Sequence, residues 1–157
     1  MDNVLFARNL VKGKIAETVF AQMLRETKDF TVLEFGYEHI VPELVQQGYA
    51  RNEGVIEILR SAPDFAVINR HTKGVHLVEV KYQHKLNSEF VLQCAERMAR
   101  SWNPSCLFVA TLDGFYFDEI DKIIAADGAI TMLDPAYIPI SMQAKYLKIL
   151  QDFETSD

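Results

Sequence analysis

The feature that most constrains the fold is a pair of apolar runs joined by a short polar turn. The runs, 61–68 and 75–82, are rich in Val, Ile and Phe, which favour strands, and residues 69–74 supply the turn between them. Pro63 can begin a strand but cannot donate a hydrogen bond inside one, which places Asp64 at the start of the first strand. The sequence therefore predicts a β-hairpin with an acid at the mouth of its first strand.

Two charged residues lie on the second strand of this hairpin. Glu79 and Lys81 are two positions apart, so their side chains project from the same face of the strand. The acid at the mouth of one strand is then close to an acid and a lysine on its neighbour. A charged cluster on a mostly apolar sheet needs a physical reason.

The composition is that of an ordinary globular domain, and the length of 157 residues fits a single domain over 1–157. Apolar residues make up 49% of the chain and charged residues 24%, without a long polar run. The start of the chain is too short and too charged for a signal peptide, and no later run approaches a membrane span. We therefore expect a cytoplasmic protein with no membrane partner, whose two cysteines, Cys94 and Cys106, are buried free thiols.

The formal net charge of −6 bears on the class of partner. A protein whose affinity came mainly from neutralising many phosphates is expected to be basic. Any contact with nucleic acid must therefore be local, assisted by a metal ion or helped by a partner.

Residues 5–28 are predicted to form a helix, since apolar residues recur at helical spacing and no proline interrupts them. Glu17 falls in the middle of the apolar stripe of this helix. An uncompensated buried carboxylate is costly, so Glu17 is expected to have a partner. Gly13, one turn earlier, would let other backbone or a ligand come close. The predicted stripe consists of Phe6, Leu10, Gly13, Phe20, Ala21 and Leu24.

The remaining elements are predicted from apolar runs and turn residues. The core order is a helix, three strands, a helix and a strand, followed by a helical tail, which predicts an α/β fold with a mixed central sheet flanked by helices. The predicted strands are 31–40, 61–68, 75–82, 106–112 and a brief one at 130–133. The further predicted helices are 42–47, 53–61, 88–101 with Ser88 as N-cap, 117–126 and 141–153.

This arrangement resembles the PD-(D/E)xK nuclease superfamily, in its restriction-endonuclease-like and Holliday-junction-resolvase-like members. The matching residues are Glu17 in the first helix, Pro63-Asp64 at the second strand and Glu79-Val80-Lys81 on the third. The acid-x-lysine tripeptide alone is unspecific, because Glu26-Thr27-Lys28 is a second copy in the same chain. The combination with Pro63-Asp64 and Glu17 carries the resemblance, which covers 5–112 and implies an αβββαβ core with a C-terminal helical extension.

The resemblance implies a metal-dependent nuclease that hydrolyses phosphodiester bonds, most often in DNA. Crowded carboxylates raise each other's pKa values unless a divalent cation joins them, and ligands that are all oxygen suit Mg²⁺ or Mn²⁺. Lys81 would orient the attacking water and stabilise developing charge. The implied catalytic residues are Glu17, Asp64, Glu79 and Lys81. The implied metal ligands are Asp64, Glu79, the carbonyl of Val80 and Glu17, the last directly or through water.

Five further residues are candidates for substrate contact. Gln93 lies on the next predicted helix, where a glutamine helps to line the site of some exonuclease-like members. The tyrosine that those members carry four residues later is replaced here by Arg97. The basic candidates for phosphate contact are Lys14, Lys85, Arg97 and Arg100, although charged residues on helices are usually just solvated.

Two alternatives stay open. A catalytically silent nuclease-fold module would keep these residues and act as a nucleic-acid-binding or protein-binding subunit, which the acidity of the chain favours. An unrelated α/β protein would carry the motif by chance, with Glu79 and Lys81 as an exposed cross-strand pair and Asp64 shaping a turn. The tail helix is expected to pack on the domain, with a homodimer or another protein partner left open.

Overall fold

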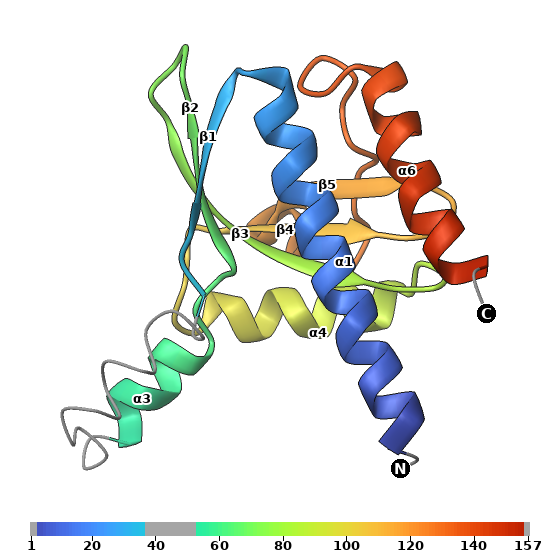
Figure 1. Ribbon diagram of the computed structural model, residues 1–157. Helices are drawn as coiled ribbons and strands as arrows, with labels where there is room; N and C mark the ends of the chain where they lie inside the picture. Colours follow the sequence, from blue (N-terminus) through green and yellow to red (C-terminus); the bar gives the residue numbers. More distant parts are fainter. Residues whose placement is uncertain (1–2, 37–52, 156–157) are drawn as a thin grey trace, which may run out of the picture.

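The computed structural model describes residues 3–36 and 53–155. Over these residues a mixed five-stranded sheet, in the order β1-β2-β3-β4-β5, is flanked by helices (Figure 1), which confirms the predicted α/β class. The strands are β1 (Phe30–Glu34), β2 (Phe65–Asn69), β3 (Val75–Tyr82), β4 (Cys106–Ala110) and β5 (Phe115–Glu119). The helices are α1 (Asn3–Thr27), α3 (Glu53–Arg60), α4 (Ser88–Ala99), α5 (Ile120–Ala125) and α6 (Ile140–Thr155). The predicted helix 42–47 and the end of the predicted strand 31–40 lie outside the described residues.

The predicted hairpin is formed by β2 and β3, which pair antiparallel. The side chain of Asn69 accepts hydrogen bonds from the backbone N–H groups of His71 and Thr72, which closes the turn. β1 pairs antiparallel with the other side of β2, and β4 lies parallel to β3. A parallel neighbour needs a crossover connection, which α4 provides. β3 is therefore an interior strand, and residues at its end lie beside the start of β2.

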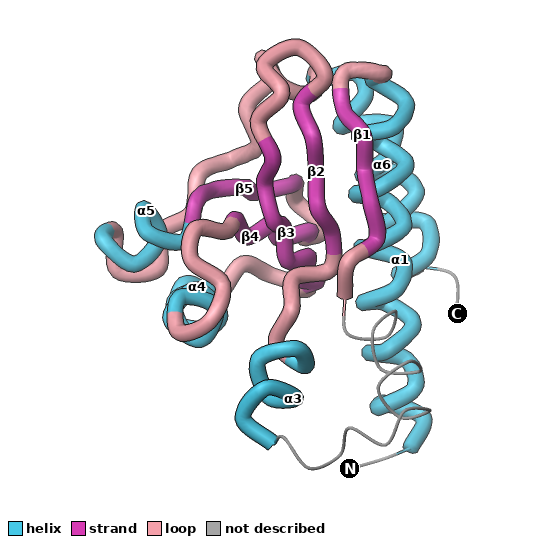
Figure 2. Tube along the Cα trace, turned by 90° about the vertical axis from the view of Figure 1, so that its left-hand side faces the viewer, coloured by secondary structure: helices cyan, strands magenta, loops and turns pink. Residues whose placement is uncertain are grey.

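The two faces of the sheet are covered by different helices. α1 and α6 lie on one face and α4 and α5 on the other (Figure 2). Val78 and Val80 of β3 belong to the core beneath α1 and α6. Since successive side chains of a strand alternate between its faces, Glu79 and Lys81 leave β3 on the side of α4. Every residue of β4 is buried, as its continuous apolar run predicts.

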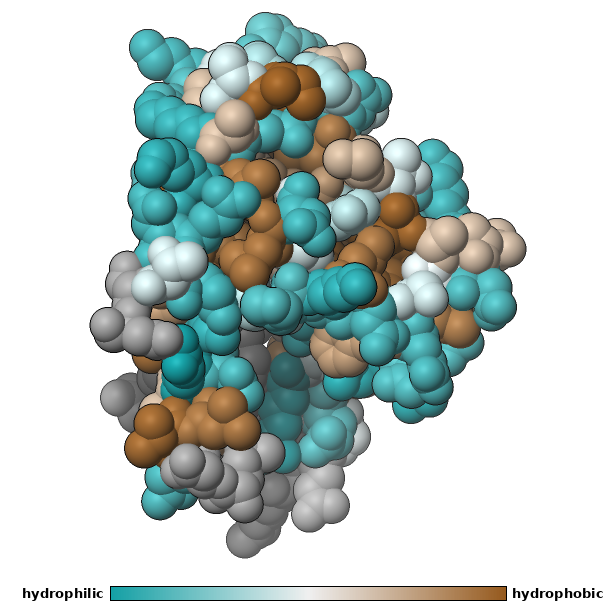
Figure 3. Space-filling view, turned by 90° about the vertical axis from the view of Figure 1, so that its right-hand side faces the viewer, coloured by the Kyte–Doolittle hydropathy of each residue, from teal (hydrophilic) through white to brown (hydrophobic). Residues whose placement is uncertain are grey.

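The first half of α1 differs from the prediction. Phe20, Ala21 and Leu24 are buried, but Phe6 and Leu10 are 53% and 57% exposed. These first turns extend past the sheet (Figure 1), so no strand lies beneath them. Figure 3 shows an apolar group of side chains low on the molecule, where the first turns of α1 lie. The predicted apolar stripe is therefore correct only in the second half of the helix.

Two predictions after β4 are only partly correct. Of the segment predicted as a helix over 117–126, residues 120–125 form the short helix α5, but 117–119 belong to strand β5. Residues 115–119 pair with β4. Phe115 and Phe117 pack against one core and Tyr116 against the other, and these aromatic side chains fit a half-buried strand. The brief strand predicted at 130–133 is a single bridge between Tyr116 and Met132.

The helical tail packs on the domain, as predicted. Leu150 of α6 is buried in the core that α1 shares with the sheet. Lys145 and Tyr146 of α6 both donate hydrogen bonds to the carboxylate of Glu26 at the end of α1. The helices that the structure describes include none long and apolar enough to cross a membrane, and Cys94 and Cys106 are buried free thiols.

The N-cap of α4 is Asn87, one residue before the predicted Ser88. Its backbone is extended, and its side-chain oxygen accepts a hydrogen bond from the N–H of Phe90 at 3.1 Å. Asn87→Ala is therefore expected to lower the free energy of unfolding by about 1 kcal/mol, measured by chemical denaturation. Ser88→Ala serves as the matched control and should cost clearly less. An equal loss in the two variants would contradict the assignment.

Candidate active site

A polar cleft opens between α1 and the neighbouring ends of β2 and β3, with a volume of about 480 Å³. All four residues predicted as catalytic line this cleft, and so does Val80. The structure therefore brings residues from three separate segments of the chain together. The lining residues are Asn9, Lys12, Gly13, Glu17, Asp64, Glu79, Val80, Lys81, Tyr82 and His84.

Asp64 is held in place by the backbone of the strands on either side. It directly precedes β2, and its Oδ2 accepts the backbone N–H of Val80 on β3 at 2.8 Å. Its carbonyl accepts the N–H groups of Phe35 and Gly36, which follow β1, at 3.0 and 3.2 Å. Hydrogen bonds from both neighbours fix the position of the carboxylate without the help of a flexible side chain.

The environment of Asp64 disfavours its charged form. Burial raises the pKa of this carboxyl to about 8, and a hydrogen bond and the charge of Glu79 act in the same direction. The N–H of Val80 and the charge of Lys81 oppose the increase in pKa but do not cancel it. Two carboxyl groups this close cannot both carry charge cheaply without a cation.

Glu17 approaches Asp64 from α1, on the other side of the sheet from Glu79. Burial raises the pKa of Glu17 to about 7, and the negative charge of Asp64 contributes to the increase. Nζ of Lys14 lies 3.1 Å from its Oε2 and opposes the increase. Glu17 therefore has the partner that was expected for a carboxylate on an apolar stripe, in Lys14. Asp64 lies between Glu17 and Glu79.

Lys81 lies beside Glu79, with 3.8 Å between its Nζ and Oε2 of the acid. The side chains of Lys81 and Glu79 are only 29% and 14% exposed, so the pair is not the exposed cross-strand pair of the alternative interpretation. The two residues also line a second hollow together with Arg60 and Arg97. Of the predicted substrate contacts, Lys14 and Arg97 are therefore close to the acids. Lys85, Gln93 and Arg100 are exposed and do not line the cleft.

The donor set determines which ion the cleft can accept. Over residues 3–36 and 53–155, no three His, Cys, Asp or Glu side chains form a group that could hold a metal ion. Asp64 and Glu79 are two adjacent carboxyls, and Val80 adds a backbone carbonyl. Mg²⁺ in proteins is typically bound by one or two carboxylates, with water and substrate phosphate completing its shell. The residues fit such a hard divalent cation, and a cation bound there would favour the charged forms of Glu17 and Asp64, which burial disfavours in its absence.

The sequence did not reveal every residue of the cleft. Asn9, Gly13 and Glu17 share one helix face at a spacing of four, a signal that could have identified Asn9. Tyr82 packs against the core and also lines the cleft. Lys12 and His84 carry no recognisable signal in the sequence.

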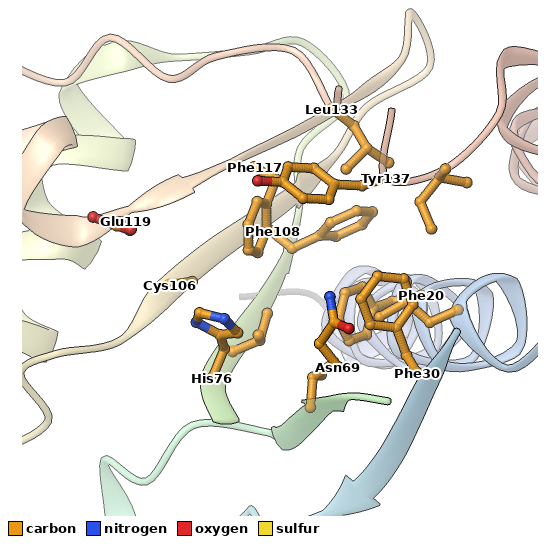
Figure 4. Close-up of a pocket in the computed structure, with 14 residues that line it drawn as sticks. Phe20, Phe30, Asn69, His76, Cys106, Phe108, Phe117, Glu119, Leu133 and Tyr137 are labelled. Atoms are coloured by element: carbon orange, nitrogen blue, oxygen red, sulfur yellow. The ribbon is translucent and has the colours of Figure 1, made fainter. Parts of the chain in front are cut away.

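A separate, apolar cavity lies between α1 and the sheet, with a volume of about 130 Å³. Figure 4 shows that aromatic side chains surround it, among them Phe20, Phe108 and Phe117. Glu119 is the one acid among its lining residues, and no lysine accompanies it. The paired acids and the lysine occur in the polar cleft, so we assign the chemistry to that cleft.

Comparison with known proteins adds nothing to this assignment, which rests on the geometry of the cleft. A scan against protein-family models gives no match for the chain, and a search of curated proteins gives none either.

Proposed function

We propose that the protein is a divalent-metal-dependent nuclease of the PD-(D/E)xK type, with DNA as its expected substrate. One observation carries the proposal. The Asp64 carboxyl is fixed by the N–H of Val80 between Glu17 and Glu79, in a cleft that Lys81 also lines. The order of elements and the parallel pairing of β3 with β4 support a restriction-endonuclease-like fold for the core.

Asp64, Glu79 and the carbonyl of Val80 would hold Mg²⁺ or Mn²⁺, with Glu17 binding directly or through water. When bound, the cation polarises the scissile phosphate and lowers the pKa of a coordinated water. Lys81 would orient the attacking water and neutralise charge that develops on the phosphate. Its position beside Glu79 on one face of β3 keeps the ammonium group next to the acids.

The acidity of the cleft means that a bound cation should strengthen the binding of substrate. Glu17, Asp64 and Glu79 face Lys81 and Lys12 in the cleft, so a phosphate meets acids as well as bases there. A divalent cation between the acids removes this repulsion. The net charge of −6 is then compatible with nucleic acid as substrate, because the contact is local and metal-assisted.

The proposal is tested by metal binding and by cleavage together. Calorimetric titration with Mn²⁺ is expected to detect binding to the wild type that Asp64→Ala abolishes, because that variant removes the central ligand. Asp113→Ala, which removes an exposed acid of the β4–β5 turn, is the matched control and should bind as the wild type does. In parallel, labelled single-stranded and double-stranded DNA and RNA should be cleaved with Mg²⁺ or Mn²⁺ and left intact in EDTA.

The possible results separate the alternatives. Metal binding with nucleic-acid binding but no cleavage would support the catalytically silent module. Metal binding that survives Asp64→Ala unchanged would remove the site and with it the nuclease proposal.

A further inference from the structure

A carboxylate from the far end of the chain reaches three residues of the cleft. Nζ of Lys12 lies 2.8 Å from Oε1 of Glu154, and the hydroxyl of Tyr82 donates to its Oε2 at 3.2 Å. Nδ1 of His84 lies 3.6 Å from Oε1. Lys12, Tyr82 and His84 all line the cleft that contains Asp64 and Glu79, whereas Glu154 does not. Two donors, Lys12 and Tyr82, and the nearby His84 ring therefore converge on one anion at the margin of the candidate active site.

These three side chains form a group suited to an oxyanion. Lys12 is only 13% exposed, and its Nζ lies 5.6 Å from the centre of the Tyr82 ring. A lysine this buried requires an anionic partner, because an unpaired charge in such a place is costly. A phosphate oxygen accepts charge-assisted hydrogen bonds from the same donors as a carboxylate oxygen. A phosphate could therefore take the place of Glu154 without leaving Lys12 unpaired.

The position of Glu154 at a helix end allows its displacement. It lies in the last turn of α6, where the helix dipole disfavours a negative charge. Helix ends fray readily, so the last turn can open without unfolding the core, which α6 contacts through the buried Leu150. The contacts of the carboxylate are thus with Lys12, Tyr82 and His84. A substrate phosphate would contact the same side chains.

We propose that Lys12, Tyr82 and His84 form a phosphate subsite for the nucleic-acid strand, and that Glu154 occupies this subsite as an internal competitor. This inference rests on the proposed nuclease function, because it assumes that the cleft binds a nucleic acid. The subsite contacts phosphate alone, so it serves DNA and RNA equally. Glu154 lowers the affinity of the cleft for any strand until a phosphate displaces it.

The test is the affinity of Glu154→Gln for fluorescein-labelled DNA and RNA oligonucleotides, measured by anisotropy in EDTA. Glutamine keeps an oxygen that accepts hydrogen bonds from Tyr82 and Lys12, while the negative charge is lost. We expect affinity for both oligonucleotides to increase about tenfold, with a dependence on salt steeper by about one phosphate contact. Glu154→Ala should show the same gain, and Glu154→Gln combined with Lys12→Met should abolish it.

Asp152→Asn is the matched control, because it removes the same charge from the same helix at a residue that does not line the cleft. It should change affinity less than twofold. An affinity that is unchanged or lower in both Glu154 variants, or an equal gain in Asp152→Asn, would overturn the subsite. If the wild type cleaves with metal but the Glu154 variants gain no affinity, the nuclease proposal stands and only the subsite is removed. If the variants gain affinity but the wild type does not cleave, the subsite stands and the nuclease proposal is removed.

Discussion

Lys81→Met is expected to lower the rate of phosphodiester cleavage on the order of 10³-fold while leaving metal binding intact. Lys81 would supply a positive charge where negative charge develops on the phosphate, and methionine keeps an unbranched side chain of similar length without that charge. The acids that would hold the cation are untouched by the substitution. Cleavage is measured with labelled DNA at saturating Mg²⁺, and Mn²⁺ binding by calorimetry.

Asp64→Asn is expected to abolish both metal binding and cleavage, whereas Lys81→Met is expected to impair cleavage alone. The asparagine side chain retains an oxygen for the N–H of Val80, so the local structure persists while the charge that attracts the cation is lost. A residue that binds metal and a residue that acts on the phosphate are thereby distinguished in one pair of measurements.

Lys122→Met is the control for a general loss of positive charge. Lys122 lies on α5 with 66% of its side chain exposed, away from the residues that line the cleft. Its cleavage rate should stay within twofold of the wild type. A Lys81→Met protein that cleaves at the wild-type rate, or that no longer binds Mn²⁺, would contradict the role assigned to Lys81.

The part of the site that the sequence predicts is the part encoded by short-range pattern. The alternation of β3 places Glu79 and Lys81 on one face, and Pro63 followed by an apolar run places Asp64 at the mouth of β2. Glu17 stands out because a carboxylate interrupts an apolar helix stripe. Each of these signals spans only a few residues, and a hairpin then brings the two acids of the strands together.

Helical periodicity identifies a face but not how much of the helix is covered. Phe6 and Leu10 continue the apolar pattern of Phe20 and Leu24, yet they are exposed because α1 extends past the sheet. Nothing in the local sequence indicates where the sheet ends beneath the helix. The predicted stripe is thus too long because the extent of the sheet beneath the helix is a tertiary property that the local sequence does not encode.

The second half of strand β5, residues 117–119, was predicted as the start of a helix for a related reason. The run from Phe115 to Glu119 is short and apolar with acids at its end, which fits either element locally. Its pairing with β4 makes it a strand, and Ile120 then begins α5. Lys12 and Glu154 are the extreme case, since 142 positions separate the two members of this ion pair. Only the assembled fold shows that α6 contacts residues that line the cleft.

The metal-free protein is expected to lose stability as pH rises from about 5 to 8. Burial and neighbouring carboxyls raise the pKa of Asp64 from 3.8 to about 8 and that of Glu17 from 4.5 to about 7. Between the unfolded and folded pKa values the folded protein binds more protons than the unfolded chain, so its free energy of unfolding falls as pH increases. We expect a decrease of about 3 kcal/mol, below what the full shifts would give, because water reaches the cleft and screens both groups.

Asp64→Asn should remove most of this dependence, because its side chain is neutral at every pH in the range. Measured by chemical denaturation in EDTA, the variant is expected to differ little from the wild type at pH 5 and to be more stable at pH 8. Asp113→Asn, at an exposed acid, should follow the wild-type curve. With saturating Mn²⁺ at pH 8 the wild type should gain stability that Asp64→Asn does not, because the cation binds only the charged acids. Parallel curves of unfolding free energy against pH for the wild type and Asp64→Asn in EDTA would mean that the pKa of Asp64 is not raised in the folded protein. The argument for a cation between the acids would then fail.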